Sequence, residues 1–317
     1  MELFLTNTCN QNCEYCYLKK YPALYPSSIN NSETILANLE KIYNYILKNN
    51  WNIPQGDFFS GEIWHTQFGL DVLELTLKYI KKGMKVGWWI VASNCSFVMN
   101  PIQTQKIQGY INEFAKFGSP LTFSISVEGK ILESESRALV SGEQKDDLYW
   151  DELFSFAKHN NFYFHPMVSS NNVQKWIENH KWFEEKFNQY DMDINALMML
   201  EVRNADWSEL SIKEYNAFMQ YLISRFLEKD CNNSIKKFTE KLFCFRLKNQ
   251  EKGLSGYIPF GFPKADDFIG CTCANSLAIR VGDLSIIPCH RLAYNKYLYG
   301  NFITDENGIK DIKSNNP

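Results

Sequence analysis

The stretch Thr6-Asn7-Thr8-Cys9-Asn10-Gln11-Asn12-Cys13-Glu14-Tyr15-Cys16-Tyr17 carries three cysteines with the spacing C-x3-C-x2-C. It directly follows Leu3-Phe4-Leu5, an apolar segment that we expect to form a short strand. Because thiolates are the usual protein ligands of iron–sulfur clusters, three of them at this spacing predict a [4Fe-4S] cluster. Three ligands for four irons leave one iron open to a small molecule, which indicates chemistry rather than electron storage alone.

Two other uses of clustered cysteines fit this stretch less well. Structural zinc takes four ligands, usually from paired C-x2-C units, and the C-x3-C step is not typical of it. Disulfide frameworks belong to small secreted domains, whereas this chain has 317 residues, nine cysteines and no recognisable signal peptide. We therefore assign Cys9, Cys13 and Cys16 to a cluster.

The cysteine spacing, together with the aromatic Tyr15 before the third cysteine, resembles the signature of radical S-adenosylmethionine (radical SAM) enzymes. The resemblance implies that SAM binds at the open iron through its amino and carboxylate groups and that Tyr15 contributes to the cofactor site. It also implies that one electron from the reduced cluster breaks a carbon–sulfur bond of SAM. The products are methionine and a 5′-deoxyadenosyl radical, which removes hydrogen from a substrate.

The composition is that of a globular chain. Hydrophobic residues make up 45% and aromatic residues 15%, and the length allows one large domain or one domain with a smaller appendage. The net charge is −3 without a basic block, so nucleic acid has no support as a partner. The sequence shows no apolar run of the roughly 18 residues that a membrane span needs. Nine cysteines without an export signal favour the reducing cytoplasm, where thiols can hold metal.

Hydrophobic periodicity predicts strands and helices in alternation from residue 3 to about 227. The expected strands are residues 3–5, 57–60, 87–92, 121–127, 162–168 and 194–202. The expected helices are residues 33–49, 70–82, 102–116, 150–158, 173–187 and one that follows the capping box Ser211-Ile212-Lys213-Glu214. Six strand-then-helix units imply a parallel α/β sheet, either doubly wound or closed as a barrel. The radical SAM resemblance favours a partial (β/α)6 barrel over residues 1–235.

Polar residues at the ends of the second and third expected strands carry the resemblance further, because ligands gather at the carboxyl ends of parallel strands. Ser60-Gly61-Glu62 resembles the Gly-Gly-Glu element of radical SAM enzymes, which implies that Gly61 and Glu62 hold the methionine amino group. Ser93-Asn94-Cys95 resembles Thr-Asn-Gly and places Asn94 at the cofactor, with Cys95 where glycine is usual. From the residues alone, an ordinary turn at Gly61 remains an alternative.

The fourth expected strand ends in Ser124-Ile125-Ser126-Val127-Glu128-Gly129, which resembles Ser-Ile-Asp-Gly. The resemblance implies that Ser126 contacts the ribose or carboxylate of SAM. It implies that Arg137 binds the carboxylate, for which a guanidinium is suited because it bonds in a bidentate way. The alternative for Arg137 is a solvated surface charge.

The fifth and sixth strands offer weaker candidates. His165 is a ligand, a proton carrier or a core histidine, and the last is the commonest use of such a residue. The Met and Leu residues of 197–200 would pack against adenine or simply fill the core. Glu201 and Arg203 would reach substrate at the barrel mouth, or form an ion pair with each other. We take Glu201 as one candidate catalytic residue.

A second group of cysteines follows the expected barrel, in residues 236–317. Residues 277–281 and 284–287 are expected to pair as a hairpin around Gly282-Asp283. The stretch from Ala278 to Arg291 resembles the SPASM/twitch extension of radical SAM enzymes, which carries auxiliary iron–sulfur clusters. The predicted ligands of such an auxiliary cluster are Cys244, Cys271, Cys273 and Cys289.

This extension departs from the full pattern, since no cysteine follows Cys289. Either the extension is cut short near Pro317, or Cys244 completes one cluster, or the site has three protein ligands and leaves room for substrate. A zinc site with the same four thiolates is the alternative. Cys231 and Cys95 are expected to be buried small hydrophobes. His290 is a candidate catalytic acid or base, with packing as the alternative.

The function expected from this resemblance is radical modification of a peptide or protein, as in the maturation of ribosomally made peptides. The resemblance implies a flavodoxin- or ferredoxin-type electron donor as a partner. Because the first strand begins at residue 3, we expect no separate leader-peptide-binding domain before it. The alternatives are a small-molecule radical SAM dehydrogenase and a non-catalytic iron–sulfur or zinc binding module. A module without SAM would not need Gly61, Glu62, Asn94 and Ser126 at strand ends.

Overall fold

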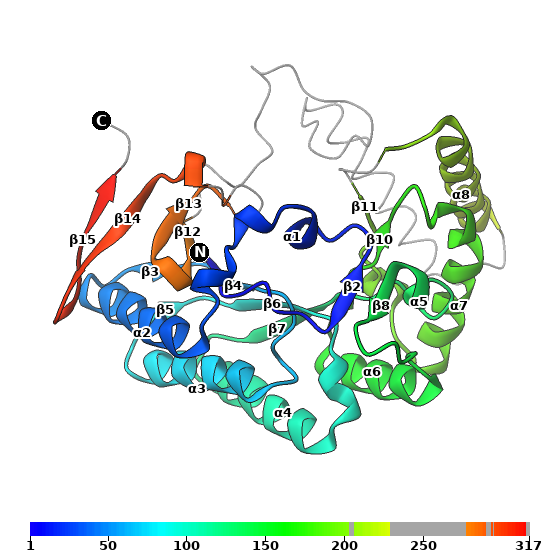
Figure 1. Cartoon of the computed structure of the whole chain (residues 1–317). Helices are drawn as coiled ribbons and strands as arrows, with labels where there is room; N and C mark the ends of the chain where they lie inside the picture. The colour runs from blue at the N-terminus through cyan, green and yellow to red at the C-terminus, as the bar shows by residue number, and fades with distance from the viewer. Residues whose placement is uncertain (203–205, 229–276, 290–292, 294, 315–317) are drawn as a thin grey trace. The chain divides into compact units, whose positions relative to one another are not determined.

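The structure is a computed structural model that describes residues 1–202, 206–228, 277–289, 293 and 295–314 (Figure 1). The chain divides into two compact units. Unit 1 comprises Met1–Asn12, Cys16–Ile125 and Cys273–Pro317, and unit 2 comprises Cys13–Tyr15 and Ser126–Thr272. The boundary expected near residue 235 lies outside the described residues.

The centre of unit 1 is a parallel sheet. Its strands are β1 (Glu2–Phe4), β4 (Gly56–Phe59), β6 (Trp89–Ser93) and β7 (Leu121–Ile125), paired in that order. Leu3 pairs with Phe58, and Phe58 pairs with Val91, so the carboxyl ends of the strands lie at one edge. All three of these side chains are buried. The parallel α/β sheet predicted from the alternation of strands and helices is therefore confirmed.

Three amphipathic helices cover one face of this sheet (Figure 1). They are α2 (Ser32–Lys48), α3 (Gln67–Lys81) and α4 (Pro101–Lys116). Each helix follows a capping residue, which is Asn31, Thr66 or Asn100 respectively. The side chain of this residue accepts a hydrogen bond from a backbone N–H of the first turn. Their apolar faces fill the layer between helices and sheet, where Phe58 stacks on Trp89 with ring centroids 4.6 Å apart. The helices fix the direction of the loops that carry the polar strand ends.

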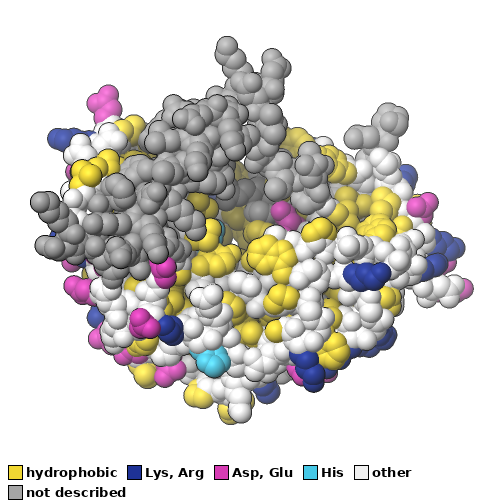
Figure 2. All heavy atoms as spheres, turned by 180° about the vertical axis from the view of Figure 1, so that it is seen from behind, with side chains coloured by type: hydrophobic (Ala, Val, Ile, Leu, Met, Phe, Trp, Pro, Cys, Tyr) yellow, Lys and Arg dark blue, Asp and Glu magenta, His cyan; other side chains and the backbone are white. Residues whose placement is uncertain are grey.

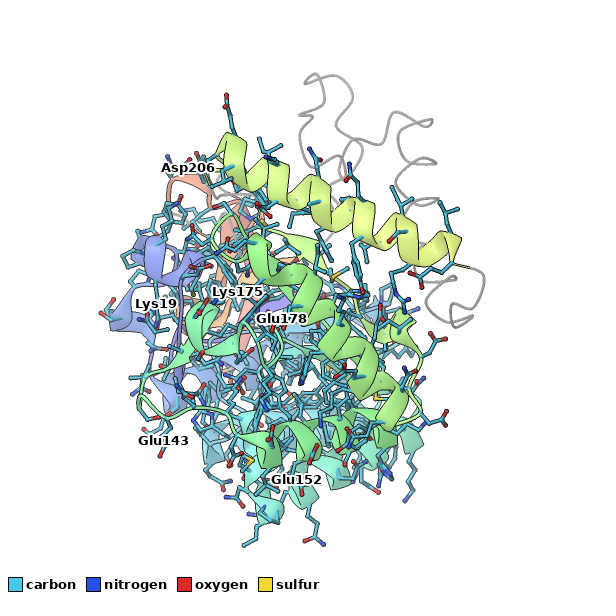
Figure 3. All side chains as sticks on the ribbon, turned by 90° about the vertical axis from the view of Figure 1, so that its right-hand side faces the viewer. Lys19, Glu143, Glu152, Lys175, Glu178 and Asp206 are labelled. Atoms are coloured by element: carbon cyan, nitrogen blue, oxygen red, sulfur yellow. The ribbon has the colours of Figure 1, made fainter. Side chains whose placement is uncertain are left out.

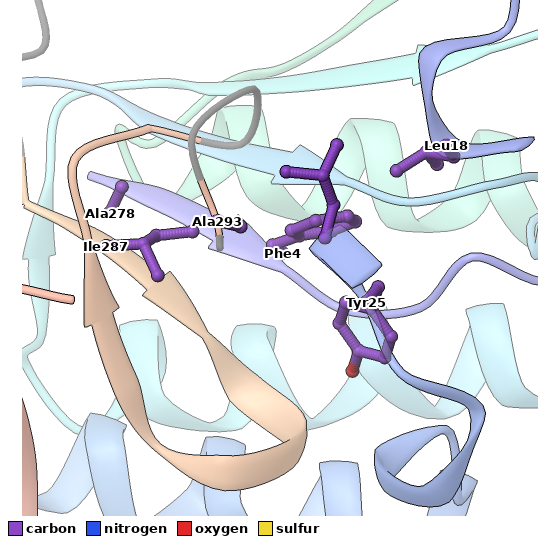
Figure 4. Close-up of a cluster of buried hydrophobic side chains, with 7 residues drawn as sticks. Phe4, Leu18, Tyr25, Ala278, Ile287 and Ala293 are labelled. Carbon is purple, nitrogen blue, oxygen red and sulfur yellow. The ribbon is translucent and has the colours of Figure 1, made fainter. Parts of the chain in front are cut away.

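The C-terminal strands extend the same sheet beyond β1. β12 (Ala278–Arg280) runs parallel to β1, and β13 (Ser285–Ile287), β14 (Gly300–Asp305) and β15 (Gly308–Ser314) follow in antiparallel order. Figure 4 shows the buried cluster that joins them to the first strand. Its members are Phe4, Leu18, Leu24, Tyr25, Ala278, Ile287 and Ala293. Sequence segments almost 280 residues apart thus share one core.

Unit 2 holds the later strands and helices. Its elements are α5 (Glu133–Ser136), β8 (Arg137–Leu139), α6 (Asp147–Asn160), β9 (Tyr163–Phe164), β10 (Met167–Val168), α7 (Trp176–Gln189), β11 (Leu200–Glu201) and α8 (Glu209–Leu227). β10 and β11 pair in parallel, with Val168 opposite Glu201. Lys175 and Glu178, labelled in Figure 3, mark the start of α7, which packs against α8. Buried aromatic rings such as Phe154 and Phe164, 4.7 Å apart, form the core.

Short elements complete the described chain. They are β2 (Gln11–Cys13), α1 (Tyr17–Lys20), β3 (Asn52–Ile53), β5 (Lys85–Val86) and the 3-10 turns η1 (Pro22–Leu24), η2 (Ser27–Ile29), η3 (Ser96–Met99), η4 (Val173–Lys175), η5 (Ile194–Ala196), η9 (Val281–Asp283) and η11 (Asn295–Tyr297).

Three expectations about local structure need correction. The cap of α8 is Ser208, whose hydroxyl accepts from the backbone N–H of Ser211, so the helix starts two residues before the expected box. Residues 194–202 are not one strand, because η5 occupies their start and only Leu200–Glu201 pair. The turn around Gly282 is a 3-10 turn closed by Leu284 in the left-handed region, φ 58°, rather than a two-residue hairpin loop.

Candidate functional site

The three motif cysteines are partly exposed and are not joined by disulfides. They sit between β1 and α1, directly after the strand on which the sheet of unit 1 is centred. Among the residues that the structure describes, no group of three or more His, Cys, Asp or Glu side chains is placed to hold a metal ion. The cluster role of Cys9, Cys13 and Cys16 therefore stays a prediction, and the structure shows how their loop is held.

In unit 1, the turn after β4 is hydrogen-bonded to the start of the cysteine loop. The N–H of Gly61 donates to the carbonyl of Thr6, and the N–H of Glu62 donates to the carbonyl of Thr8, each at 2.8 Å. A Cβ at Gly61 would lie 2.5 Å from the carbonyl carbon of Thr8 and 2.9 Å from the Cβ of Cys9. Glycine is required because the backbone of the cysteine loop approaches so closely. The absence of a side chain at Gly61 thus allows the backbone of the cysteine loop to lie against the turn after β4.

The carboxylate of Glu62 ties the end of β4 to the end of β6. It is 2% exposed and accepts from the Ser93 hydroxyl at 2.9 Å and from the Asn94 N–H at 2.6 Å. The N–H of Trp64 donates to the other carboxylate oxygen at 3.2 Å. A buried carboxylate is stable only when it is hydrogen-bonded in this way. Its placement beside the cysteine loop is as expected, and the side chain organises the strand ends.

Asn94 links the same strand end to the residue after Cys9. Its amide nitrogen donates to the Asn10 side-chain oxygen at 2.8 Å, and its own oxygen accepts from the Ser96 N–H at 2.9 Å. The next residue, Cys95, is fully buried with φ 53°, in the left-handed region. Glycine adopts that region without strain. This explains physically why the Thr-Asn-Gly pattern that Ser93-Asn94-Cys95 resembles has glycine there.

A pocket of about 400 Å³ opens beside Cys9 in unit 1. Its lining combines the cysteine loop, the turn after β4 and the starts of α2 and α3. The lining residues are Thr6, Thr8, Cys9, Asn10, Asn30, Ser32, Ile35, Glu62, Ile63, His65, Thr66 and Phe68. Burial lowers the pKa of His65, so its imidazole is neutral near pH 7. The pocket is thus lined by neutral polar groups and by the apolar side chains of Ile35, Ile63 and Phe68, with one buried carboxylate.

In unit 2, Tyr15 belongs to a buried polar cluster. Its hydroxyl donates to Glu128, and the Nε of Arg137 donates to the same carboxylate oxygen at 2.7 Å. The guanidinium carbon of Arg137 lies 5.3 Å from the centre of the Tyr15 ring. Burial raises the pKa of Tyr15, so the phenol keeps its proton. Burial disfavours the charge on Arg137, but Tyr15 and Glu128 outweigh it and raise its pKa.

Arg137 is therefore a buried member of an ion pair, 8% exposed, and not a solvated surface charge. It also lines a pocket of about 210 Å³ with the buried ion pair of Lys145 and Glu133. Its expected role toward a carboxylate of SAM stays a prediction, since its Nε is engaged with Glu128.

The remaining predicted site residues are placed as follows. Ser126 is half-buried and directly follows β7. Glu201, on β11, accepts a hydrogen bond from the Tyr215 hydroxyl. His165 is half-buried, and Cys289 is buried. The other predicted residues, Arg203, Cys231, Cys244, Cys271, Cys273 and His290, lie outside the described residues.

Sequence reasoning missed the role of Glu128. It lay within the Ser-Ile-Asp-Gly-like element, where attention went to Ser126 as a ligand of the cofactor. A usable signal was an acidic residue directly after a buried strand and before a glycine, here Gly129 with φ 97°. An acid in that position, within a buried run, needs a positive partner.

Charged side chains of both signs are mixed on the described surface drawn in Figure 2. On the face drawn in Figure 2, the described Lys and Arg side chains are interspersed with Asp and Glu and do not form one basic patch. Within the described part of the chain, no helix combines the length and the apolar composition that crossing a membrane requires.

Comparison with known proteins identifies a shared fold. No family model and no curated protein matches the sequence. Native anSMEcpe with bound AdoMet and Cp18Cys peptide superposes with a TM-score of 0.55 at 15% identity, covering 95% of this chain and 76% of that chain. Native anSMEcpe with bound AdoMet gives a TM-score of 0.56 at 16% identity, with 95% and 78% covered. Polyhistidine-tagged anSMEcpe with bound AdoMet gives 0.54 at 17%, with 95% and 74% covered.

The chain therefore shares its fold with anSMEcpe, a protein solved with AdoMet bound, and the cysteine motif led us to expect a fold of an AdoMet-binding protein. At this sequence identity the likeness extends no further than the fold.

Proposed function

We propose that this chain is a radical SAM enzyme that modifies a peptide or protein substrate. The observation that carries the proposal is the C-x3-C-x2-C motif with Tyr15, placed after the first strand of a sheet that has the fold of anSMEcpe. The alternation of strands and helices over residues 2–227 supports a partial (β/α)6 barrel as the complete architecture. The bond that is formed or broken in the substrate is left open.

The donor set fits a [4Fe-4S] cluster with an open iron. Cys9, Cys13 and Cys16 are partly exposed and supply three thiols, the ligand type that holds such clusters. Gly61 and Glu62 hold the start of their loop by two backbone hydrogen bonds. When bound, the cluster and SAM would supply the one-electron cleavage that yields a 5′-deoxyadenosyl radical.

The chain's own residues would bind SAM and exclude water around it. Asn94 and Ser126 follow neighbouring strands, and Asn94 is already oriented by Asn10 and Ser96. Glu62 fixes the strand end that presents Asn94, because its carboxylate accepts the Asn94 N–H. We assign Tyr15 and Arg137 to the same cofactor site, where the Glu128 carboxylate orients both side chains.

The peptide substrate is proposed by analogy with anSMEcpe, which has been seen with the Cp18Cys peptide bound. Glu201 and His290 are the proposed acid–base residues, and a flavodoxin- or ferredoxin-type protein is the proposed electron donor. Cys289, with Cys244, Cys271 and Cys273, is proposed to hold an auxiliary iron–sulfur cluster in a SPASM/twitch-type extension. We place the enzyme in the cytoplasm, where these thiols stay reduced.

The test is SAM cleavage under strict exclusion of oxygen. The protein is reconstituted with iron and sulfide, reduced with dithionite and given SAM, and 5′-deoxyadenosine is quantified. We expect wild type to form 5′-deoxyadenosine and Cys13→Ala to form none. Cys231→Ala is the matched control, because it removes a thiol outside both predicted ligand sets and should retain the activity.

A wild-type protein that carries a cluster but forms no 5′-deoxyadenosine would overturn the enzyme assignment and favour a non-catalytic iron–sulfur module. Zinc in place of iron after purification, held equally well by Cys13→Ala, would overturn the cluster assignment as well. If SAM is cleaved, the Cp18Cys peptide seen with anSMEcpe is the first substrate to compare with small molecules.

A further inference from the structure

The tripeptide Cys13-Glu14-Tyr15 is held at three points within unit 2. The N–H of Glu14 donates to the carbonyl of Ser136 at 3.0 Å. The hydroxyl of Ser169 donates to the Glu14 carboxylate at 2.8 Å, and the Tyr15 hydroxyl donates to Glu128. The segment between the second and third motif cysteines is thus bonded through both its backbone and its side chains.

Glu128 is the most constrained of these anchors. Its side chain is fully buried, and its two oxygens accept from Tyr15, from the Arg137 Nε at 2.7 Å and from the Met167 N–H at 2.6 Å. Its backbone N–H donates to the Glu133 carboxylate at 2.7 Å, and its carbonyl accepts from Asn179 at 2.6 Å. The position of this carboxylate is therefore set by the segment after β7, α5, β8, β10 and α7.

These contacts hold the Glu128 carboxylate in one position. A buried charge that loses its partners is strongly destabilising, so Glu128 and Arg137 must stay together. Tyr15 is held between them, with its hydroxyl on the carboxylate and its ring under the guanidinium.

We propose that Glu128 is a positioning residue for the cysteine loop. Through the Tyr15 hydroxyl it fixes the tripeptide between the second and third cysteines, and with it the direction in which Cys13 presents its thiol. The inference rests on the proposed function only in taking Cys13 as a cluster ligand.

The first test uses the full chain without cluster or SAM. Hydrogen exchange is followed by mass spectrometry in wild type, Tyr15→Phe, Glu128→Gln and the control Glu184→Gln. Glu184 is a suitable control because it is also a paired carboxylate, 3.0 Å from Arg225, but lies on α7 away from the tripeptide contacts. In Tyr15→Phe and Glu128→Gln we expect residues 11–17 to exchange about tenfold faster, or about 1.4 kcal/mol. Peptides from α2 should exchange at the wild-type rate in Tyr15→Phe.

The second test uses the reconstituted protein. Electron paramagnetic resonance of the reduced cluster and its midpoint potential are compared in the same four proteins. Glu128→Gln weakens the hold on Tyr15 and with it the position of Cys13, so the spectrum and the midpoint potential of the reduced cluster should both differ from wild type. Glu184→Gln should match wild type in both the spectrum and the potential.

The inference would be overturned if residues 11–17 exchanged their amide hydrogens at the wild-type rate in both Tyr15→Phe and Glu128→Gln. It would also be overturned if the paramagnetic resonance spectrum and the midpoint potential of Glu128→Gln equalled those of wild type. If Glu128→Gln exchanges faster along the whole chain, it has unfolded, and Tyr15→Phe alone decides. The exchange test needs neither cluster nor SAM, so a failure to cleave SAM would refute the proposed function without deciding this inference.

Discussion

Gly61→Ala is the sharpest single test of how the cysteine loop is held. The added methyl group would lie 2.5 Å from the Thr8 carbonyl carbon and 2.9 Å from the Cys9 Cβ. The first of these is backbone, so the clash cannot be relieved by turning a side chain. The loop must move away, and the hydrogen bonds from Gly61 to Thr6 and from Glu62 to Thr8 must lengthen.

The expected cost follows from these contacts. Overpacking of a tight site costs about 1–3 kcal/mol, and each weakened hydrogen bond adds about 1 kcal/mol. The free energy of unfolding should therefore fall by about 3–5 kcal/mol, measured by urea denaturation of the cluster-free protein with tryptophan fluorescence. The iron content after reconstitution should fall as well, because Cys9 shifts with the loop.

Gly109→Ala is the matched control for this substitution. Gly109 lies in the interior of α4, and a Cβ there would meet nothing within 4 Å. Alanine should stabilise the helix by about 0.5–1 kcal/mol and leave iron loading unchanged. A Gly61→Ala protein as stable as Gly109→Ala, with full iron loading, would refute the close approach of the turn and the cysteine loop.

Three further predictions concern unit 1 and use the same urea assay. Glu62→Gln places an amide nitrogen against the donors of Ser93 and Asn94, so the free energy of unfolding should fall by about 1–3 kcal/mol. An unchanged free energy of unfolding would argue against these two hydrogen bonds to Glu62. Ile279→Ala removes a fully buried side chain from β12 and should cost about 2–5 kcal/mol, whereas a negligible cost would mean that β12 does not share the core of β1. Both Cys95→Gly and Cys95→Ala remove the buried thiol, but only glycine adopts the positive φ without strain. The glycine variant should therefore be more stable than the alanine variant by about 1 kcal/mol. Equal stabilities of the two variants would contradict the left-handed backbone at residue 95.

The sheet and its helices were predictable because they depend on local patterns. The expected helix 102–116 corresponds to Pro101–Lys116, where Asn100 and Pro101 are both strong start signals. The expected strand 87–92 corresponds to Trp89–Ser93. Errors occurred where tertiary contacts decide the outcome, as at residues 194–202, where apolar residues alone do not distinguish a 3-10 turn from a strand.

The site was predictable as a set of positions and not as a set of contacts. The motif located Gly61, Glu62 and Asn94 at strand ends, but its spacing carries no information about which groups bond to one another. That Glu62 accepts from Asn94, or that Arg137 pairs with Glu128, depends on side chains that are 32 and 9 residues apart in the sequence. Such pairings follow from the need of buried charges for partners, which requires knowledge of burial.

The contacts also distinguish the residues that would bind a cluster from the residues that hold the cysteine loop in place. The three predicted cluster ligands, Cys9, Cys13 and Cys16, are partly exposed. A short loop with exposed thiols has little apolar area with which to fix its own shape, so the order must come from neighbouring groups. Gly61 and Glu62 supply it by backbone hydrogen bonds at the start of the loop, and Glu128 by a buried charge at Tyr15. Hence the residues most sensitive to substitution should include those that hold the loop, and not only the cysteines themselves.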